Sequence, residues 1–98
     1  MNVSMTTAIV GVGSTAQGQL PGRSANDIAA EAIQLALDDA GISKDEVDGL
    51  ITCRNLQGRA CIDEQVGLLM GMNPAYSATL DYGTGNFSVH LGVMAITA

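Results

Sequence analysis

Residues 77–98 read SATLDYGTGNFSVHLGVMAITA, and this stretch predicts a strand, a tight turn and a helix in direct succession. We expect the strand over residues 77–82, the turn over residues 83–85 and the helix over residues 86–98. The helical part contains no charged residue, and its apolar side chains lie on every side of it. Because a helix that is apolar all round is buried all round, we expect other protein to cover this one.

Two further strand–helix pairs precede this stretch. Short apolar runs at residues 7–12 and 49–53 predict buried strands. One helix is predicted from the capping residue Ser24 to Gly41, and a shorter one over residues 63–70. Strands that alternate with helices are joined by right-handed crossovers, so the order βαβαβα predicts an α/β fold with α/β/α layers and a mostly parallel sheet.

Length and composition describe a globular segment with little charge. The chain has 98 residues, of which 47% are hydrophobic, and this composition excludes intrinsic disorder. Only 14% of the residues are charged, against about 25% in ordinary domains, and two cysteines are too few for a disulfide-stapled miniprotein. Since three strands cannot bury the final helix on all sides, we expect residues 1–98 to be an incomplete N-terminal segment of a larger protein, or to be covered by another chain.

The chain is acidic, and its net charge of −6 excludes a nucleic-acid-binding face and disfavours contact with an anionic membrane surface. The acids gather at one predicted helix end and the turn after it, where we expect them to be solvated: Asp38, Asp39, Asp45, Glu46 and Asp48. In the same turn, Ser43 and Glu46 predict a capping box. No apolar run has the length of a membrane span or of a signal sequence, so we expect a cytoplasmic protein.

The cysteines do not indicate a metal site. Cys53 and Cys61 are separated by seven residues, and the chain has one histidine, a set too small for zinc. We expect both cysteines to be reduced thiols that pack as small hydrophobic residues.

A glycine-rich motif follows the first predicted strand. Residues 11–16 (GVGSTA) match the pattern GxGxxA, with Glu31 further along the chain, and this pattern is typical of dinucleotide-binding sites. In such sites a helix begins at once, so that its N-terminus meets the pyrophosphate. Here Gly18, Pro21 and Gly22 delay the helix, which favours the alternative of a simple turn from strand to loop.

Tyr82 is the candidate catalytic residue. It ends the third predicted strand and precedes a glycine turn and a helix, at the carboxyl edge of the sheet, where α/β folds concentrate ligands and catalysis. A tyrosine is a poor nucleophile at neutral pH, but it serves as a general acid or base once its environment tunes it. A packed tyrosine is the alternative. His90 has no acid near it in sequence and is predicted to be a core or interface residue.

Several segments resemble the N-terminal part of the thiolase superfamily, and most of all the sterol-carrier-protein-type thiolases and the acetyl-CoA acetyltransferase-like proteins. Residues 8–13 (AIVGVG) resemble the first strand of that family. Residues 21–24 (PGRS) and 29–42 resemble its first helix, and residues 47–52 (VDGLIT) resemble the start of its second strand. The resemblance implies a thiolase fold, an acyl-CoA thioester as substrate, no other cofactor, and a homodimer with the third strand near the interface.

The nucleophilic cysteine of the family is replaced in this chain. Aligning the family's turn after the third strand with residues 83–85 places Tyr82 at the cysteine position, and neither cysteine of the chain falls there. The resemblance thus implies Tyr82 as the catalytic residue and Gly83 and Asn86 as substrate-binding residues. Some thiolase-like proteins that lack the cysteine cleave 3-hydroxyacyl-CoA esters by a retro-aldol reaction, often with a small OB-fold partner.

Three functions stay open under this resemblance. The first, which Tyr82 favours, is carbon–carbon cleavage of an acyl-CoA without an acyl-enzyme; it needs a base and an oxyanion site but no thiolate. The second is a non-catalytic thiolase-like subunit that binds acyl-CoA or scaffolds an active partner. The third is an ordinary acetyl-CoA acetyltransferase of lipid metabolism, whose acyl-enzyme chemistry needs a thiolate.

Overall fold

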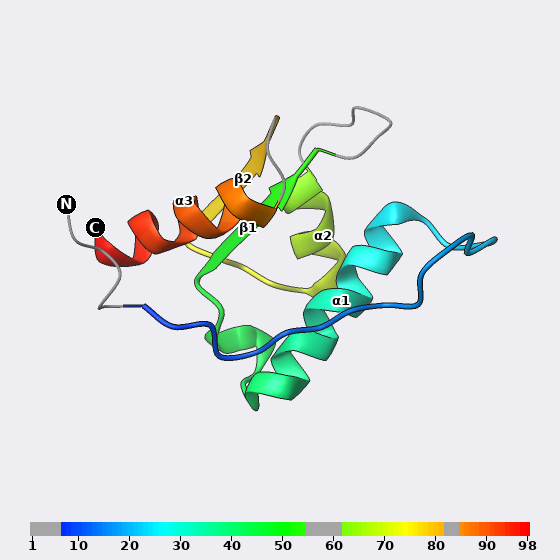
Figure 1. Cartoon of the computed structure of the whole chain (residues 1–98), viewed down its shortest axis with the longest axis horizontal. Helices are drawn as coiled ribbons and strands as arrows, with labels where there is room; N and C mark the ends of the chain where they lie inside the picture. Colours follow the sequence, from blue (N-terminus) through cyan, green and yellow to red (C-terminus); the bar gives the residue numbers. More distant parts are fainter. Residues whose placement is uncertain (1–6, 55–61, 82–84) are drawn as a thin grey trace.

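The computed structural model of the chain describes residues 7–54, 62–81 and 85–98, and its elements alternate between helices and strands (Figure 1). In chain order, the elements are α1 (Ala25–Ala40), the 3₁₀ helix η1 (Lys44–Glu46), β1 (Gly49–Cys53), α2 (Ile62–Met70), β2 (Tyr76–Leu80) and α3 (Gly85–Thr97). The predicted helices and the last two predicted strands are therefore confirmed, with bounds that shift by at most two residues at any end.

The two strands form a parallel sheet between helical layers. β1 and β2 pair from Gly49 opposite Tyr76 to Cys53 opposite Leu80. Side chains alternate between the two faces of a strand, and the contacts of the sheet follow this alternation. Leu50 contacts α2 at Gly67, whereas its neighbour Ile51 contacts α3 at Gly92. The sheet thus lies between α2 and α3, and α1 packs beside α2, which confirms the α/β/α layering (Figure 1).

Local chemistry sets the ends of the first helix. The Ser24 hydroxyl accepts a hydrogen bond from the backbone N–H of Asp27 at 3.1 Å, and Gly41 ends the helix with a φ of 72° in the left-handed region. The predicted capping box is also present, because the Glu46 carboxylate accepts from the Ser43 N–H at 2.7 Å.

The first predicted strand does not form in the part of the chain that the structure describes. Residues 7–13 run along α1 without a strand partner, and the apolar side chains of Ile9 and Val10 are exposed. Glycine permits this close approach, since a Cβ at Gly13 would lie 2.6 Å from the backbone nitrogen of Ala36. The backbone N–H of Val12 donates to the Asp39 carboxylate at 2.9 Å instead of to a strand. The prediction of a buried strand is therefore wrong for these residues, because strand pairing requires a partner that the sequence pattern does not identify.

The core is small and lies on the α2 side of the sheet. Its buried apolar residues are Leu37, Leu50, Ile62, Val66 and Met72. In the described residues α3 packs on β1, and these residues leave much of the helix uncovered, so the expectation that other protein covers α3 stays a prediction. Its other apolar side chains are exposed, and these are Phe87, Val89, Met94 and Ile96. Among the described helices, none is long and apolar enough to cross a membrane.

Candidate active site at the carboxyl edge of the sheet

The connection from β2 to α3 is the candidate site that the sequence predicts. Because β1 and β2 are parallel, both strands end at the same edge, and α3 begins there. Tyr82 and Gly83 lie outside the described residues, so their predicted roles stay predictions. Asn86 is the second residue of α3 and is exposed. Helix N-termini favour negative charge, so this edge suits an anionic substrate or a developing oxyanion.

Arg54 and Asp81 form an ion pair at this edge. Arg54 follows β1, and its Nη2 lies 3.2 Å from Oδ1 of Asp81, the residue after β2. The Arg54 backbone N–H also donates to the Leu80 carbonyl at 2.8 Å, which extends the contact between the strands by one residue. Two interactions from one residue therefore hold the end of β2.

Cys53 connects the same edge to α3. Its Sγ lies 2.9 Å from the Ser88 Oγ, in the first turns of the helix. The Cys53 thiol forms no disulfide with the described residues and is half-buried. Cys53 lies on β1, the strand that neighbours β2, and not in the β2–α3 connection, where the resemblance predicts the catalytic residue. Cys61 lies outside the described residues.

A buried carboxylate joins α2 to the other face of the sheet. Asp63, the second residue of α2, is 8% exposed and accepts hydrogen bonds from the hydroxyls of Ser77 and Thr79 on β2. Its own backbone N–H donates to the Thr79 hydroxyl at 2.9 Å. Thr52 on β1 lies 2.9 Å from the same hydroxyl, hence the network spans α2 and both strands.

The hydroxyls stabilise the charged form of this acid. Hydrogen bonds from Ser77 and then Thr79 hold the pKa of the Asp63 carboxyl below its ordinary value of 3.8, with help from backbone N–H groups at the start of α2 and against the effect of burial. The carboxylate is therefore ionised at neutral pH and fully hydrogen-bonded. These properties suit a structural anchor better than a proton-transfer group.

The other sequence candidates lie elsewhere. No helix begins after the glycine-rich residues 11–16, because α1 starts only at Ala25, and this supports the simple turn over a dinucleotide site. His90 is exposed, which contradicts a core position and leaves the interface prediction untested. Residues 7–54, 62–81 and 85–98 contain no cluster of ligating side chains that could hold a metal ion. The acids around η1 are exposed, as predicted.

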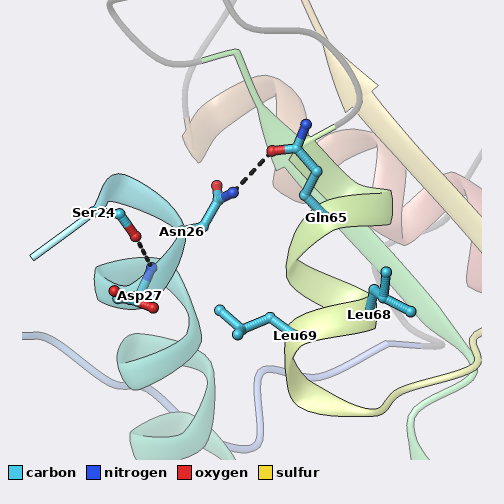
Figure 2. A pocket seen from close by; sticks show the side chains of 6 residues that line it. All are labelled: Ser24, Asn26, Asp27, Gln65, Leu68 and Leu69. Carbon is cyan, nitrogen blue, oxygen red and sulfur yellow. Dashed lines mark hydrogen bonds between the residues drawn. The ribbon is translucent and has the colours of Figure 1, made fainter.

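Hollows lined by described residues border the helices, and the two considered next do not have the composition of an active site. One, of about 390 Å³, lies between the start of α1 and α2 and is lined by Ser24, Asn26, Asp27, Gln65, Leu68 and Leu69 (Figure 2). Its amides are occupied with each other, because Asn26 donates to Gln65 at 2.8 Å. The other, of about 330 Å³, has apolar walls from the segment around Val10, from α1 and from β1.

The sequence reasoning missed two features of this region. The Arg54–Asp81 pair joins residues 27 positions apart, and only the strand register brings them together. The Asp63 network left a weak signal, since Ser77 and Thr79 alternate along β2 and must share one face of the strand. An acid at the start of a helix is ordinary, so that signal alone did not identify the network.

Known proteins resemble this chain in sequence and in fold. No family model matches the chain. Over 50 residues, or 51% of the chain, it is 50% identical to the 17-hydroxy-3-oxo-4-pregnene-20-carboxyl-CoA lyase of Mycobacterium tuberculosis, of which it covers 13%. Its fold matches the crystal structure of a monomeric SCP2-thiolase-like protein type 1 from Mycobacterium smegmatis, with a TM-score of 0.65 and 26% identity over 91% of this chain and 19% of that one.

Both relatives are much longer than this chain, which spans less than a fifth of either. The solved relative is described as monomeric, so it gives no support to the predicted homodimer. The likeness in sequence to a carboxyl-CoA lyase and the likeness in fold to an SCP2-thiolase-like protein agree with each other and with the resemblance seen in the residues. The chain is therefore similar in sequence to a carboxyl-CoA lyase and in fold to an SCP2-thiolase-like protein.

Proposed function

We propose that the protein cleaves a carbon–carbon bond of a 3-hydroxyacyl-CoA thioester by a retro-aldol reaction, without an acyl-enzyme. The observation that carries this proposal is the 50% identity to a protein named as a carboxyl-CoA lyase. The resemblance, which aligns Tyr82 with the cysteine of thiolases, supports it further, because thiolase chemistry through an acyl-enzyme requires a thiolate nucleophile.

The name of that relative describes a suitable substrate. Its substrate carries a hydroxyl on carbon 17 and a carboxyl-CoA on carbon 20, so the hydroxyl is on the β carbon of the thioester. In a retro-aldol step, a base removes the hydroxyl proton and the C–O⁻ electron pair forms a ketone. The bond between the α and β carbons breaks, and its electrons form the thioester enolate, which then takes a proton at the α carbon.

This reaction assigns a role to each candidate residue. Tyr82 is the proton-transfer group, because a phenol can act as a general acid or base when its surroundings tune it. Gly83 and Asn86 contact the substrate at the start of α3. There the N-terminus of the helix favours the negative charge that develops on the thioester oxygen as the enolate forms.

The test uses the full-length protein with 17-hydroxy-3-oxo-4-pregnene-20-carboxyl-CoA and with a 3-ketoacyl-CoA plus CoA. Tyr82→Phe removes the phenol hydroxyl and is expected to lower kcat for cleavage by about 10²–10⁴-fold, as for loss of a general acid or base. Tyr76→Phe is the matched control, because Tyr76 lies at the opposite end of β2 and is exposed. The control variant is expected to keep full activity.

The other functions predict different results. If Tyr82→Phe keeps full kcat, the catalytic role of Tyr82 is wrong. Turnover of the 3-ketoacyl-CoA, with none of the hydroxy thioester, would identify an ordinary thiolase. Binding of acyl-CoA with no turnover of either would identify a non-catalytic subunit.

The proposal includes a protein partner over α3 and a cytoplasmic location. Phe87 and Ile96 are exposed on α3 at 64% and 68%, and apolar side chains exposed on one element favour a covering surface. A second copy of the chain or a small OB-fold protein would supply that surface.

The free thiol of Cys53 supports a reducing compartment. Sedimentation equilibrium of the full-length protein distinguishes a dimer from a monomer.

A further inference from the structure

The hollow between α1 and α2 has the features of a docking site for another helix. This α1–α2 groove lies between the start of α1 and the exposed side of α2, and its volume is about 390 Å³ (Figure 2). Leu68 and Leu69 form its apolar wall, and their exposed fractions are 84% and 54%. Two adjacent leucines exposed to this extent favour burial against another surface.

Side-chain amides hold the two walls of the groove together. Asn26 of α1 donates to Gln65 of α2 at 2.8 Å, so the walls are fixed to each other before any ligand enters. Both walls are helices, whose backbone groups are mostly hydrogen-bonded within each helix, and the amides are bonded to each other. The groove therefore offers few hydrogen bonds, and an occupant must satisfy its own polar groups.

These properties favour a helix as the occupant. The backbone of a helix is hydrogen-bonded within itself, whereas an extended peptide needs partners for its N–H and C=O groups. An amphipathic helix presents a row of apolar side chains at intervals of three and four residues. Such a row can pack beside Leu68 and Leu69 while the polar side of the helix stays in water.

Acidic side chains border the leucines on both walls. Asp27 lines the groove from α1, and Glu64 is exposed one helical turn before Leu68, on the same side of α2. Arg23 is the only lysine or arginine among residues 1–43, and it is paired with Glu31. The groove thus has an apolar centre and acidic borders, which attract a helix whose basic residues flank its apolar ones.

A second copy of the chain does not supply such a helix. The net charge of the chain is −6, and its apolar helix α3 contains no lysine or arginine. The amino group of Lys44 donates to the Met70 carbonyl at 2.7 Å, where it compensates the negative end of α2. The acidic borders of two copies repel each other, and the solved relative is described as monomeric. The occupant is therefore expected in a different protein.

We propose that the α1–α2 groove binds an amphipathic helix of another protein. The apolar side chains of that helix pack on Leu68 and Leu69, and its basic side chains lie beside Asp27 and Glu64. This binding function is independent of the proposed cleavage reaction, because no residue of the groove belongs to the candidate active site.

The experiment titrates the full-length protein with two synthetic peptides of about 14 residues, one of leucine and lysine and one of leucine and glutamate, both patterned as amphipathic helices. Calorimetry at low salt is expected to show a Kd of about 10–100 μM for the lysine peptide and no binding of the glutamate peptide. Added salt should weaken the binding, because exposed acidic groups are screened.

Substitutions on the two walls identify the site. Leu68→Ser should raise the Kd by about tenfold, because it removes an apolar contact at the centre of the groove. Asp27→Asn and Glu64→Gln should each raise it about two- to fivefold, as for exposed ion pairs. The matched controls lose the same kinds of group elsewhere: Ile96→Ser on the exposed side of α3 and Asp45→Asn in η1. Both controls should bind the lysine peptide as the parent does.

Other results would overturn the proposal. An equal loss of affinity in Ile96→Ser or Asp45→Asn would show unspecific attraction to an acidic protein. Equal binding of the glutamate peptide, or no binding of the lysine peptide at about 1 mM, would remove the charge argument. A Leu68→Cys variant that reacts with a maleimide no faster than the parent would show that a second copy, or other residues of the same protein, already cover the groove.

Discussion

Replacing Asp63 by asparagine tests whether the buried network holds α2 on the sheet. The substitution keeps the size of the side chain and removes its charge. In the parent, both carboxylate oxygens accept hydroxyl hydrogen bonds, one from Ser77 and one from Thr79. An asparagine can accept only with its single oxygen, so one of the two hydroxyls faces an amide N–H₂ and must reorient.

The expected loss follows from the number and type of these bonds. A hydrogen bond to a charged group contributes about 1.5–3 kcal/mol and a neutral one about 1 kcal/mol, so two bonds lose about 2 kcal/mol together. The charge also interacts with the N-terminus of α2, which adds about 0.3–1 kcal/mol. Asp63→Asn should therefore lower the free energy of unfolding by about 2–3 kcal/mol at pH 7.

The pH dependence gives a second, independent signature. Because the pKa of Asp63 is lowered by folding, the native state binds fewer protons at this site than the unfolded state does. The stability that Asp63 contributes is therefore complete above its unfolded value of 3.8 and is lost as the pH falls through the lower, folded value. The gap between the parent and Asp63→Asn should be constant from pH 5 to pH 8 and should narrow below pH 3.8.

Urea unfolding of the full-length protein at pH 7 and at pH 3 measures both quantities. Glu64→Gln is the control, because Glu64 lies in the same turn of α2 but is exposed, so it shares the helix-terminus effect without the network. A loss for Asp63→Asn no larger than that of Glu64→Gln would refute the argument. So would a gap that is equally wide at both pH values.

Two further predictions concern the ends and neighbours of α1. Ser24→Ala removes the hydroxyl that accepts from the Asp27 N–H and should cost about 1 kcal/mol of unfolding free energy, whereas Ser24→Asp should retain the cap. Gly13→Ala places a methyl group 2.6 Å from the Ala36 backbone nitrogen, so the segment must move away from α1. This should cost about 1–3 kcal/mol in the same urea assay, and an unchanged midpoint would show that the segment does not rest on α1.

Interactions between near neighbours in sequence explain which elements were predictable. The bounds of α1 follow from Ser24 at one end and Gly41 at the other, and both act within a turn of the helix they terminate. The same is true of the capping box at η1. Such signals depend on a few consecutive residues, and the structure confirms each of them.

Pairing between distant segments explains the error at the first strand. Residues 7–12 have the apolar, β-branched composition of a strand, as do residues 49–53. The second run became a strand because β2 lies beside it in register, while the first lies against α1. An apolar, β-branched composition favours a strand, but it does not identify the neighbouring strand that provides the hydrogen bonds.

The candidate site shows the same division between local and distant information. A strand followed by glycines and a helix predicts a connection at the sheet edge. The structure confirms the strand before this connection, β2, and the helix after it, α3. The groups that surround it are set by register. Arg54 reaches Asp81, and Thr52 reaches Thr79, only because β1 and β2 pair with Cys53 opposite Leu80. A slip of one residue would turn each of these side chains to the other face of the sheet.

The two faces of this sheet consequently carry different chemistry. The α2 face contains an ionised, fully hydrogen-bonded acid with hydroxyl partners, which is suited to fixing the strands in place. The α3 face contains small and apolar contacts and a thiol, which permit close packing of an uncharged helix. A polar network on one face resists register slip, because a shift would leave a charge buried without partners. The network on the α2 face therefore helps to set which residues of β1 and β2 meet at the carboxyl edge, where Arg54 and Asp81 form their ion pair.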